Sequence, residues 1–205
     1  MSQTLQSFLD ALASNAPAPG GGAAAALMGA TGAALVSMVC NLTRGKPKYA
    51  TVEGDMQSLL EKSEALRAHL TKMMEDDQAV FRTLMSAYGL PKQTDAEKTE
   101  RKQAIQDALK RATEVPRACA RACAEVITLS REAAEIGNLQ VVSDAGVAAA
   151  AAEAGLKSAA LNVWINVPSI EDKRFADAAR KEIDDLIDAG GEDSAAVYAL
   201  VKSKL

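Results

Sequence analysis

Apolar residues recur along most of this chain at spacings of three and four residues, which is the period of an α-helix. In residues 4–14 they share one face of a short predicted helix, formed by Leu5, Phe8, Leu9 and Leu12. Residues 51–87 keep the same spacing over a much longer stretch. No segment alternates apolar and polar residues for long enough to predict a strand, so the fold is expected to be all-α.

The segment 20–44 predicts a helix of a different kind. It follows the sequence PAPGGG and contains no charged residue before Arg44. One face is a stripe of mostly small residues: Gly22, Ala26, Gly29, Ala33, Val36 and Cys40. Such a stripe lets a neighbouring helix approach closely, and the Ala- and Gly-rich helix predicted at 143–167 is the expected partner. The segment is long enough to cross a bilayer, but its few large apolar residues favour a buried central helix.

The remaining pattern predicts two further helical regions. A charged helix is expected at 95–113, with a kink or a restart at Pro116 and a continuation over 117–136. Two short amphipathic helices are expected at 172–189 and 192–203, separated by Gly190 and Gly191. Together these segments predict an up-and-down helical bundle of long helices with additional short C-terminal helices, in a single domain spanning 1–205.

Composition narrows the class of protein. Apolar residues make up 48% of the chain but aromatic residues only 3%, which is typical of closely packed helices. The net charge is -4 with both signs interleaved, so neither nucleic acid nor a membrane is an expected partner. The odd number of cysteines, three, favours a reduced cytoplasmic protein. Cys119 and Cys123 are expected to be buried, and His69 has no partner at ligand spacing, so no metal site is predicted.

Several polar positions are candidates for chemistry. The glycines that precede the predicted helix 20–44 leave unpartnered N–H groups that can receive a polar ligand; they are Gly20, Gly21 and Gly22. Asp77 lies on an otherwise apolar seam, where a carboxylate is costly unless it is paired or used, unless a small rotation places it at the edge. Asp144 begins the helix expected to pack against the glycine-rich one, although it can equally be a simple cap. Lys46 and Lys48 either complement a helix C-terminus or bind a ligand.

Five motifs extend this interpretation, namely PAPGGGAAAA, ALVSMVCNLTRGKPKY, LPKQTDAEKTERKQAIQDAL, EVPRACARAC and GNLQVVSDAGVAAA. In this order they resemble the cyclodeaminase/cyclohydrolase family of formiminotetrahydrofolate cyclodeaminases and methenyltetrahydrofolate cyclohydrolases. The resemblance covers about residues 4–172. It implies a helical bundle, a homodimer and a folate site in a groove near the dimer interface. Two positions depart from the family pattern: Ala23 replaces a usual serine and Pro47 a usual lysine.

The folate chemistry assigns expected roles to the candidates. The 5,10-methenyl bridge is an amidinium-like cation attacked by water, so a carboxylate is needed to orient and deprotonate that water. Asp144 is the expected carboxylate, with Asp77 as its alternative or assistant. Neutral polar groups for the pterin ring are expected from Gln106, Asn138 and Ser143, and cations for the glutamate tail from Lys46, Lys48 and Lys92. No cofactor is expected beyond the folate substrate.

The resemblance leaves two activities open. A free-standing chain without a formiminotransferase domain favours the cyclohydrolase, which reversibly converts 5,10-methenyl- to 10-formyltetrahydrofolate in one-carbon metabolism. The alternative is the cyclodeaminase, which releases ammonia from the formimino substrate. A second alternative, of another class, is a non-catalytic folate-binding helical protein.

Overall fold

The computed structural model describes residues 4–205, which form α-helices and short 3-10 turns and contain no β-strand. The all-α prediction is therefore confirmed over this range. The α-helices are α1 (Leu5–Leu12), α2 (Gly21–Thr43), α3 (Glu53–Tyr88), α4 (Asp95–Ile136), α5 (Val142–Asn166) and α6 (Lys173–Lys204). The 3-10 turns are Pro47–Val52, Leu139–Val141 and Val167–Ser169.

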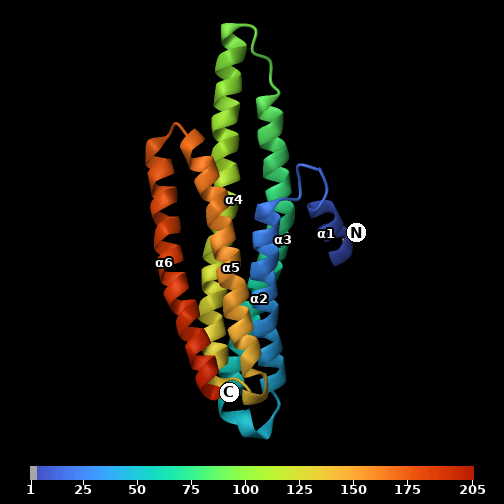
Figure 1. The fold of residues 1–205 in the computed structure, drawn as a ribbon, viewed down its shortest axis with the longest axis vertical. Coiled ribbons are helices and arrows are strands. Elements are labelled where there is room, and N and C mark those ends of the chain that lie inside the picture. Colours follow the sequence, from blue (N-terminus) through green and yellow to red (C-terminus); the bar gives the residue numbers. More distant parts are fainter. Residues whose placement is uncertain (1–3) are drawn as a thin grey trace.

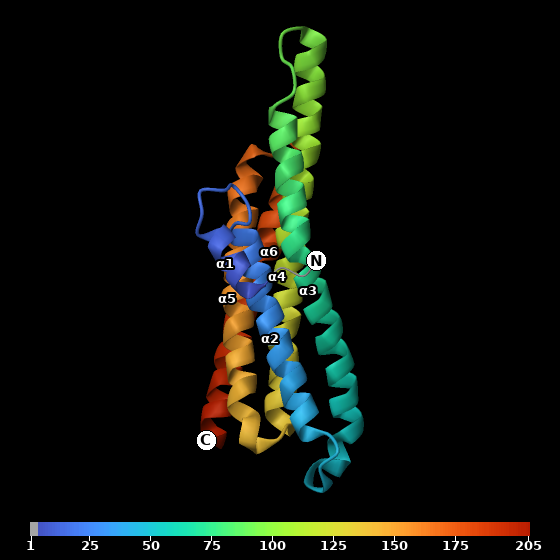
Figure 2. The ribbon, with the colours of Figure 1, turned by 90° about the vertical axis from the view of Figure 1, so that its right-hand side faces the viewer.

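The long helices run up and down side by side, with α2 and α5 at the centre of the face seen in Figure 1. α6 lies along the outer edge against α5 and α4 (Figure 1). α3 and α4 extend beyond the other helices as a projecting hairpin, and the short α1 lies outside the bundle (Figures 1 and 2). Because α2 is shorter than α3 and α4, its N-terminus lies part-way along the bundle, below that hairpin (Figure 2).

The predicted close packing of the two small-residue helices is confirmed for α2 and α5. A Cβ atom added to Gly155 would lie 3.0 Å from both the Ala25 oxygen and the Gly29 nitrogen. One added to Gly32 would lie 2.8 Å from the Ala148 oxygen. The absence of side chains at these positions therefore allows the two backbones to approach, which is how a seam with few large residues gains its packing.

Of the two outcomes predicted at Pro116, a kink or a restart, the restart does not occur, because α4 continues through this residue. Proline has no N–H, so the carbonyl oxygen of Ala112, one turn earlier, loses its helical donor. The Asn166 side chain of α5 replaces that donor with its Nδ2 atom, 3.0 Å from the Ala112 oxygen. A contact from another helix thus offsets part of the cost that the local sequence imposes.

The two short C-terminal helices were predicted wrongly, because α6 is one helix of 32 residues that includes Gly190 and Gly191. Gly190 is buried, and a Cβ atom there would lie 2.4 Å from Cδ2 of Leu156 in α5. Glycine inside a helix costs about 1 kcal/mol relative to alanine. Here the glycine leaves room for Leu156, and the packing of α6 against α5 keeps the helix continuous at this position.

Within the described residues, one helix, Gly21–Thr43, has the length and composition to cross a membrane. Its most apolar window is 61% buried inside the bundle, where it is covered mainly by α3 and α5. This agrees with the interpretation of the segment as a central helix.

Candidate active site

A carboxylate meets the N-terminus of α2. Asp77, on α3, accepts a hydrogen bond from the Ala23 backbone N–H through Oδ2, with a donor–acceptor distance of 3.0 Å. The contact depends on Gly22, since a Cβ atom at that position would lie 2.0 Å from Asp77 Oδ1. The glycine segment therefore admits a carboxylate of the same chain to the positive end of the helix.

The surroundings of Asp77 raise its pKa above that of an ordinary aspartate. Desolvation by burial is the larger cause, and the hydrogen bond from Ala23 opposes it. Among residues 4–205 no lysine, arginine or histidine forms an ion pair with this carboxylate. A half-buried carboxylate with a raised pKa and no cationic partner has the properties of a general base.

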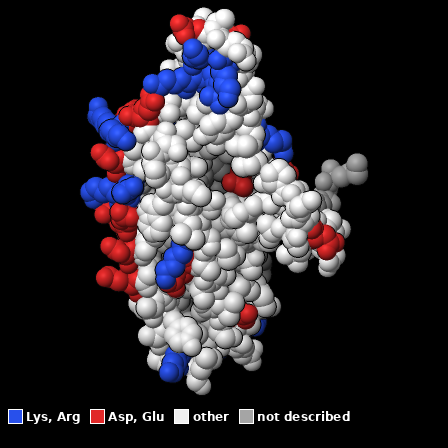
Figure 3. Space-filling view, turned by 45° about the horizontal axis from the view of Figure 1, so that its top comes forward, with Lys and Arg blue, Asp and Glu red and all other residues white. Residues whose placement is uncertain are grey.

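A groove of about 250 Å³ opens beside Asp77, between α3, α4 and α5. Most of its wall is apolar, and its polar side chains are those of Asp77, Asn162 and Asn166. The full lining is Asp77, Val80, Phe81, Leu84, Ala112, Asn162, Ile165 and Asn166. Figure 3 shows a hollow in a mostly uncharged face, with an acidic group inside it. The volume suits one ring system of a ligand.

A second group of predicted residues gathers at the other end of the bundle. Lys46 and Lys48 border a cleft of about 170 Å³ together with Tyr49 and Asn138. Asn138 itself is buried and structural: its Nδ2 donates to the Leu42 oxygen, and its Oδ1 accepts from Tyr49 and from the backbone of Gln140. The structure thus brings the two lysines together. The side-chain amide of Asn138 already forms hydrogen bonds within the chain through both Oδ1 and Nδ2.

Asp144 lies at this second end, in the first turn of α5. α5 packs on α2 as expected, but the two helices are antiparallel, so Gly21 faces Asn162 and not Asp144. Asp144 and Asn162 are separated by about 27 Å along α5, at 1.5 Å per residue. The two candidate carboxylates therefore do not share a site within one chain. The expectation that Asp77 assists Asp144 is not met within a single chain.

The other predicted polar residues lie apart from both groups. Gln106 uses both ends of its amide to hold the connection between α5 and α6, donating to the Ser169 oxygen and accepting from the Glu171 backbone. Lys92 is exposed in the turn between α3 and α4.

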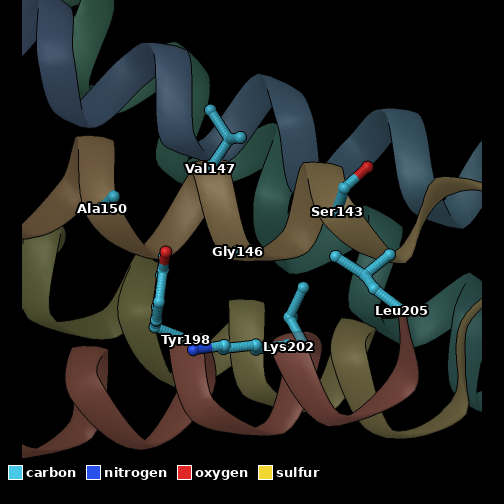
Figure 4. A pocket seen from close by; sticks show the side chains of 8 residues that line it. Ser143, Gly146, Val147, Ala150, Tyr198, Lys202 and Leu205 are labelled. Atoms are coloured by element: carbon cyan, nitrogen blue, oxygen red, sulfur yellow. The ribbon is translucent and has the colours of Figure 1, made fainter.

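Ser143 lies beside a larger cavity of about 380 Å³ between α5 and the end of α6 (Figure 4). That cavity is mainly apolar, and its lining contains Tyr198 and Lys202 but no aspartate or glutamate. It therefore lacks an acidic side chain to activate water, whereas the groove beside Asp77 contains one.

Asn162 and Asn166 are the groove residues that the sequence analysis did not single out. They are four residues apart in the segment LNVWIN, so they lie on one face near the end of α5. A pair of amides at this spacing in an otherwise apolar stretch was the available signal. Its meaning depends on contacts with α2 and α4, which the local sequence does not contain.

Comparison with known proteins identifies the family of this chain. The sequence model of the family described as formiminotransferase-cyclodeaminase matches residues 4–185. The chain belongs to this family. It is 56% identical to the methenyltetrahydrofolate cyclohydrolase of Methylorubrum extorquens, with 99% of this chain and 98% of that protein covered. It is 33% identical to the formimidoyltransferase-cyclodeaminase of Rattus norvegicus, over 98% of this chain and 37% of that protein.

The fold also matches that of a solved structure. The crystal structure of formiminotetrahydrofolate cyclodeaminase from Thermotoga maritima superposes with a TM-score of 0.82 at 32% identity. The match covers 99% of this chain and 96% of that one. The helical bundle is therefore that of a family whose members carry the names of both activities raised by the sequence.

Proposed function

We propose that this protein is a methenyltetrahydrofolate cyclohydrolase that reversibly hydrolyses 5,10-methenyltetrahydrofolate to 10-formyltetrahydrofolate. The observation that carries the proposal is the half-buried Asp77 carboxylate beside a groove of suitable size. The 56% identity to a cyclohydrolase over almost the whole chain supports the same reaction.

In the proposed mechanism Asp77 orients a water molecule against the methenyl carbon. As the water oxygen bonds to that carbon, Asp77 takes one of its protons. The tetrahedral adduct then collapses: the bond from this carbon to N5 breaks, N5 takes the proton held by Asp77, the formyl group stays on N10, and the second water proton leaves the hydroxyl for solvent. N5 ends as N–H, and one proton is released overall. The negative charge of Asp77 also stabilises the cationic substrate before the attack.

The composition of the groove favours hydrolysis over deamination. Expulsion of ammonia requires a proton donor near the leaving nitrogen, and Asp77 is the one titratable side chain in the described lining. A second acid, histidine or lysine would be needed for efficient proton delivery. The proposed hydrolysis requires neither a metal nor a redox cofactor.

A side-by-side assay of the purified protein tests this assignment. Decay of the near-ultraviolet absorbance of methenyltetrahydrofolate, corrected for buffer hydrolysis, is compared with ammonia release from 5-formiminotetrahydrofolate. We expect the first reaction to be faster. Faster ammonia release would assign the protein to the cyclodeaminases, and inactivity with retained substrate binding would support the non-catalytic folate-binding alternative.

We further propose a homodimer that pairs the α2/α5 face with its copy. This face exposes large apolar side chains: Met38, Leu42, Val147, Leu161 and Ile165. Few charges lie on it, and charges gather instead along α6 and at the hairpin end (Figure 3). A two-fold axis perpendicular to the helices would place Lys46 and Lys48 of the partner subunit near the groove of the first. The lysines would then reach the glutamate tail of the folate across the interface.

Sedimentation of the wild type and of Met38→Glu tests the proposed dimer. Met38 is 42% exposed on the proposed interface, and a charge there would be desolvated, so the variant should become monomeric at micromolar concentration. Met85→Glu is the matched control, since Met85 is 44% exposed near the end of α3, outside this face. A dimer that survives Met38→Glu but not Met85→Glu would place the interface elsewhere.

We propose a reducing, cytoplasmic location. The three cysteines are buried and unpaired, and burial raises the pKa of the Cys40 thiol to about 11. Thiols of this kind behave as small apolar side chains.

A further inference from the structure

The polar side chains that line the groove keep three oxygen atoms free to accept hydrogen bonds, namely Asp77 Oδ1, Asn162 Oδ1 and Asn166 Oδ1. Asn162 Nδ2 donates to the Ser158 oxygen at 2.8 Å, and Asn166 Nδ2 donates to the Ala112 oxygen at 3.0 Å. A carbonyl oxygen only accepts, so each amide must turn its NH₂ toward the carbonyl and its Oδ1 away from it. Within residues 4–205, no group donates to either Oδ1 or to Asp77 Oδ1.

The orientation of Asn166 depends on a proline in a different helix. Pro116 interrupts the hydrogen bonding of α4 and frees the carbonyl oxygen of Ala112, a residue that lines the groove. Any other residue at position 116 would supply an N–H to that oxygen. Within residues 4–205 the freed carbonyl is the only hydrogen-bond partner of the Asn166 side chain, and it fixes the direction in which Oδ1 points.

A groove with three free acceptor oxygens favours a ligand edge that offers donors. The reduced pterin ring of a tetrahydrofolate has such an edge, formed by its 2-amino group and by N3–H, and N8–H is a further donor. The apolar groove wall, which includes Val80 and Phe81, provides surface for the ring faces. Asp77 lines the same groove, so a ring held there would share one site with this carboxylate.

We propose that Asn162 and Asn166 are substrate-binding residues whose amide oxygens accept N–H groups of the pterin, and that Pro116 is a positioning residue for Asn166. This inference rests on the proposed folate substrate. It adds the orientation of that substrate, with the aminopyrimidine edge of the pterin toward the end of α5. It also gives the proline in α4 a role in specificity.

The test compares Asn166→Leu with wild type on two ligands, methenyltetrahydrofolate and its analogue without the 2-amino group. Removal of one buried hydrogen-bond partner costs about 5- to 150-fold in affinity. We expect the KM of Asn166→Leu for the natural substrate to rise by a factor in this range, with a smaller change in kcat. Wild type should prefer the amino form, and the variant should lose most of that preference.

Two further variants separate recognition from folding. Gln78→Leu removes an amide on α3 that also donates to a helix carbonyl, that of Met74 at 3.2 Å, but lies outside the groove lining, so its KM should not change. Pro116→Ala restores an N–H donor for the Ala112 oxygen. Its melting temperature should be equal or higher, while its KM rises several-fold because Asn166 loses its fixed partner. Asn162→Leu replaces Asn166→Leu if the latter does not fold.

Binding of both ligands is also measured by protein fluorescence, so the outcome does not depend on turnover. Normal KM and unchanged discrimination in Asn166→Leu, Asn162→Leu and Pro116→Ala would overturn the inference. Wild-type discrimination without any hydrolysis would overturn the proposed cyclohydrolase activity but support this recognition. Failure of the wild type to bind either ligand would overturn both.

Discussion

The two ends of the α2–α5 pair contain similar residue types in different environments. At one end, the Asp77 carboxylate is desolvated, accepts a backbone N–H and faces a groove. At the other end, Asp144 lies in the first helical turn of α5, beside a segment that carries Lys46 and Lys48. Similar residue types therefore acquire different properties: burial without a cationic partner raises the pKa of Asp77, whereas an end that carries two lysines is suited to binding anions.

The strongest test of this contrast exchanges each aspartate for asparagine. Asp77→Asn should reduce kcat by about a hundredfold to ten-thousandfold, because the amide cannot accept the water proton. Asp144→Asn should stay within about tenfold of wild type, since Asp144 lies in the first turn of α5, after the N-cap Val141, and does not line the groove that contains Asp77. Steady-state hydrolysis of methenyltetrahydrofolate measures both. The opposite ranking would return the base to Asp144, and two active variants would exclude a carboxylate base.

A smaller but still large loss is expected from Gly22→Ala. The added methyl group would overlap Asp77 Oδ1 at 2.0 Å, so the carboxylate must leave the N-terminus of α2. We expect kcat to fall by about a hundredfold, within the range for a displaced general base. Gly191→Ala is the matched control: nothing lies within 4 Å of its added Cβ, and it should stabilise α6 by about 1 kcal/mol. If the two variants were equally active, the contact between Gly22 and Asp77 would not be needed for catalysis.

The lysine end should affect substrate affinity more than chemistry. Replacing Lys46 and Lys48 together by alanine should raise KM for a folate with its glutamate tail by about tenfold, as expected for two lost charge-assisted contacts. The same change should hardly affect a pterin substrate that lacks the tail. Steady-state kinetics of the double variant and the wild type with each of the two substrates give the KM values to compare.

Mixed dimers sharpen this result. If each site combines Asp77 of one subunit with the lysines of the other, a mixture of Asp77→Asn and the double-lysine variant contains some intact sites. At low substrate concentration, activity should recover to about a quarter of wild type, the statistical share of intact sites in randomly assembled dimers. Activity equal to the mean of the separate variants would place both groups of residues in sites within single subunits.

The smallest expected effect is on stability. Because the folded-state pKa of Asp77 is raised, the ionised carboxylate destabilises the fold above that pKa, and the penalty disappears as pH falls below the unfolded-state value. Asp77→Asn should therefore be more stable than wild type at neutral pH, and the gain should vanish in acid. Denaturant titrations across pH measure this. The rate of the wild type should rise with pH through the same raised pKa. A variant that is less stable at every pH would show that the carboxylate is structural.

The fold was largely predictable because the residues that make its main helix–helix contacts recur at helical spacing in the sequence. The small-residue stripes identified the α2–α5 pair. The start of α4 is also encoded locally, because Thr94 and Glu97 have the spacing of the capping box that they form there. The continuity of α4 and α6 was not predictable from local sequence. It depends on Asn166 and Leu156, both in α5, which compensate for Pro116 and Gly190 from another part of the chain.

The candidate site was predictable only in part, for the same reason. Asp77 was identifiable as a carboxylate on an apolar seam. Gly20, Gly21 and Gly22 were identifiable as positions that another polar group can approach closely. Their direct contact was not, because it joins residues 54 positions apart. Asn162 and Asn166 carried too weak a local signal, since their orientation depends on carbonyls that become available only in the folded bundle.

The contact of Gly155 with α2 also has a consequence for synthesis of the protein. α2 has no charged side chain, yet the helix that packs against its small-residue face is translated about 120 residues later. At ribosomal rates this is a delay of roughly 6 to 24 s. During that interval α2 is an uncharged apolar segment outside the ribosome, with α3 as its first available cover. The nascent chain is therefore expected to depend on chaperones until α5 emerges, and slower translation of α4 should lower the yield of folded protein.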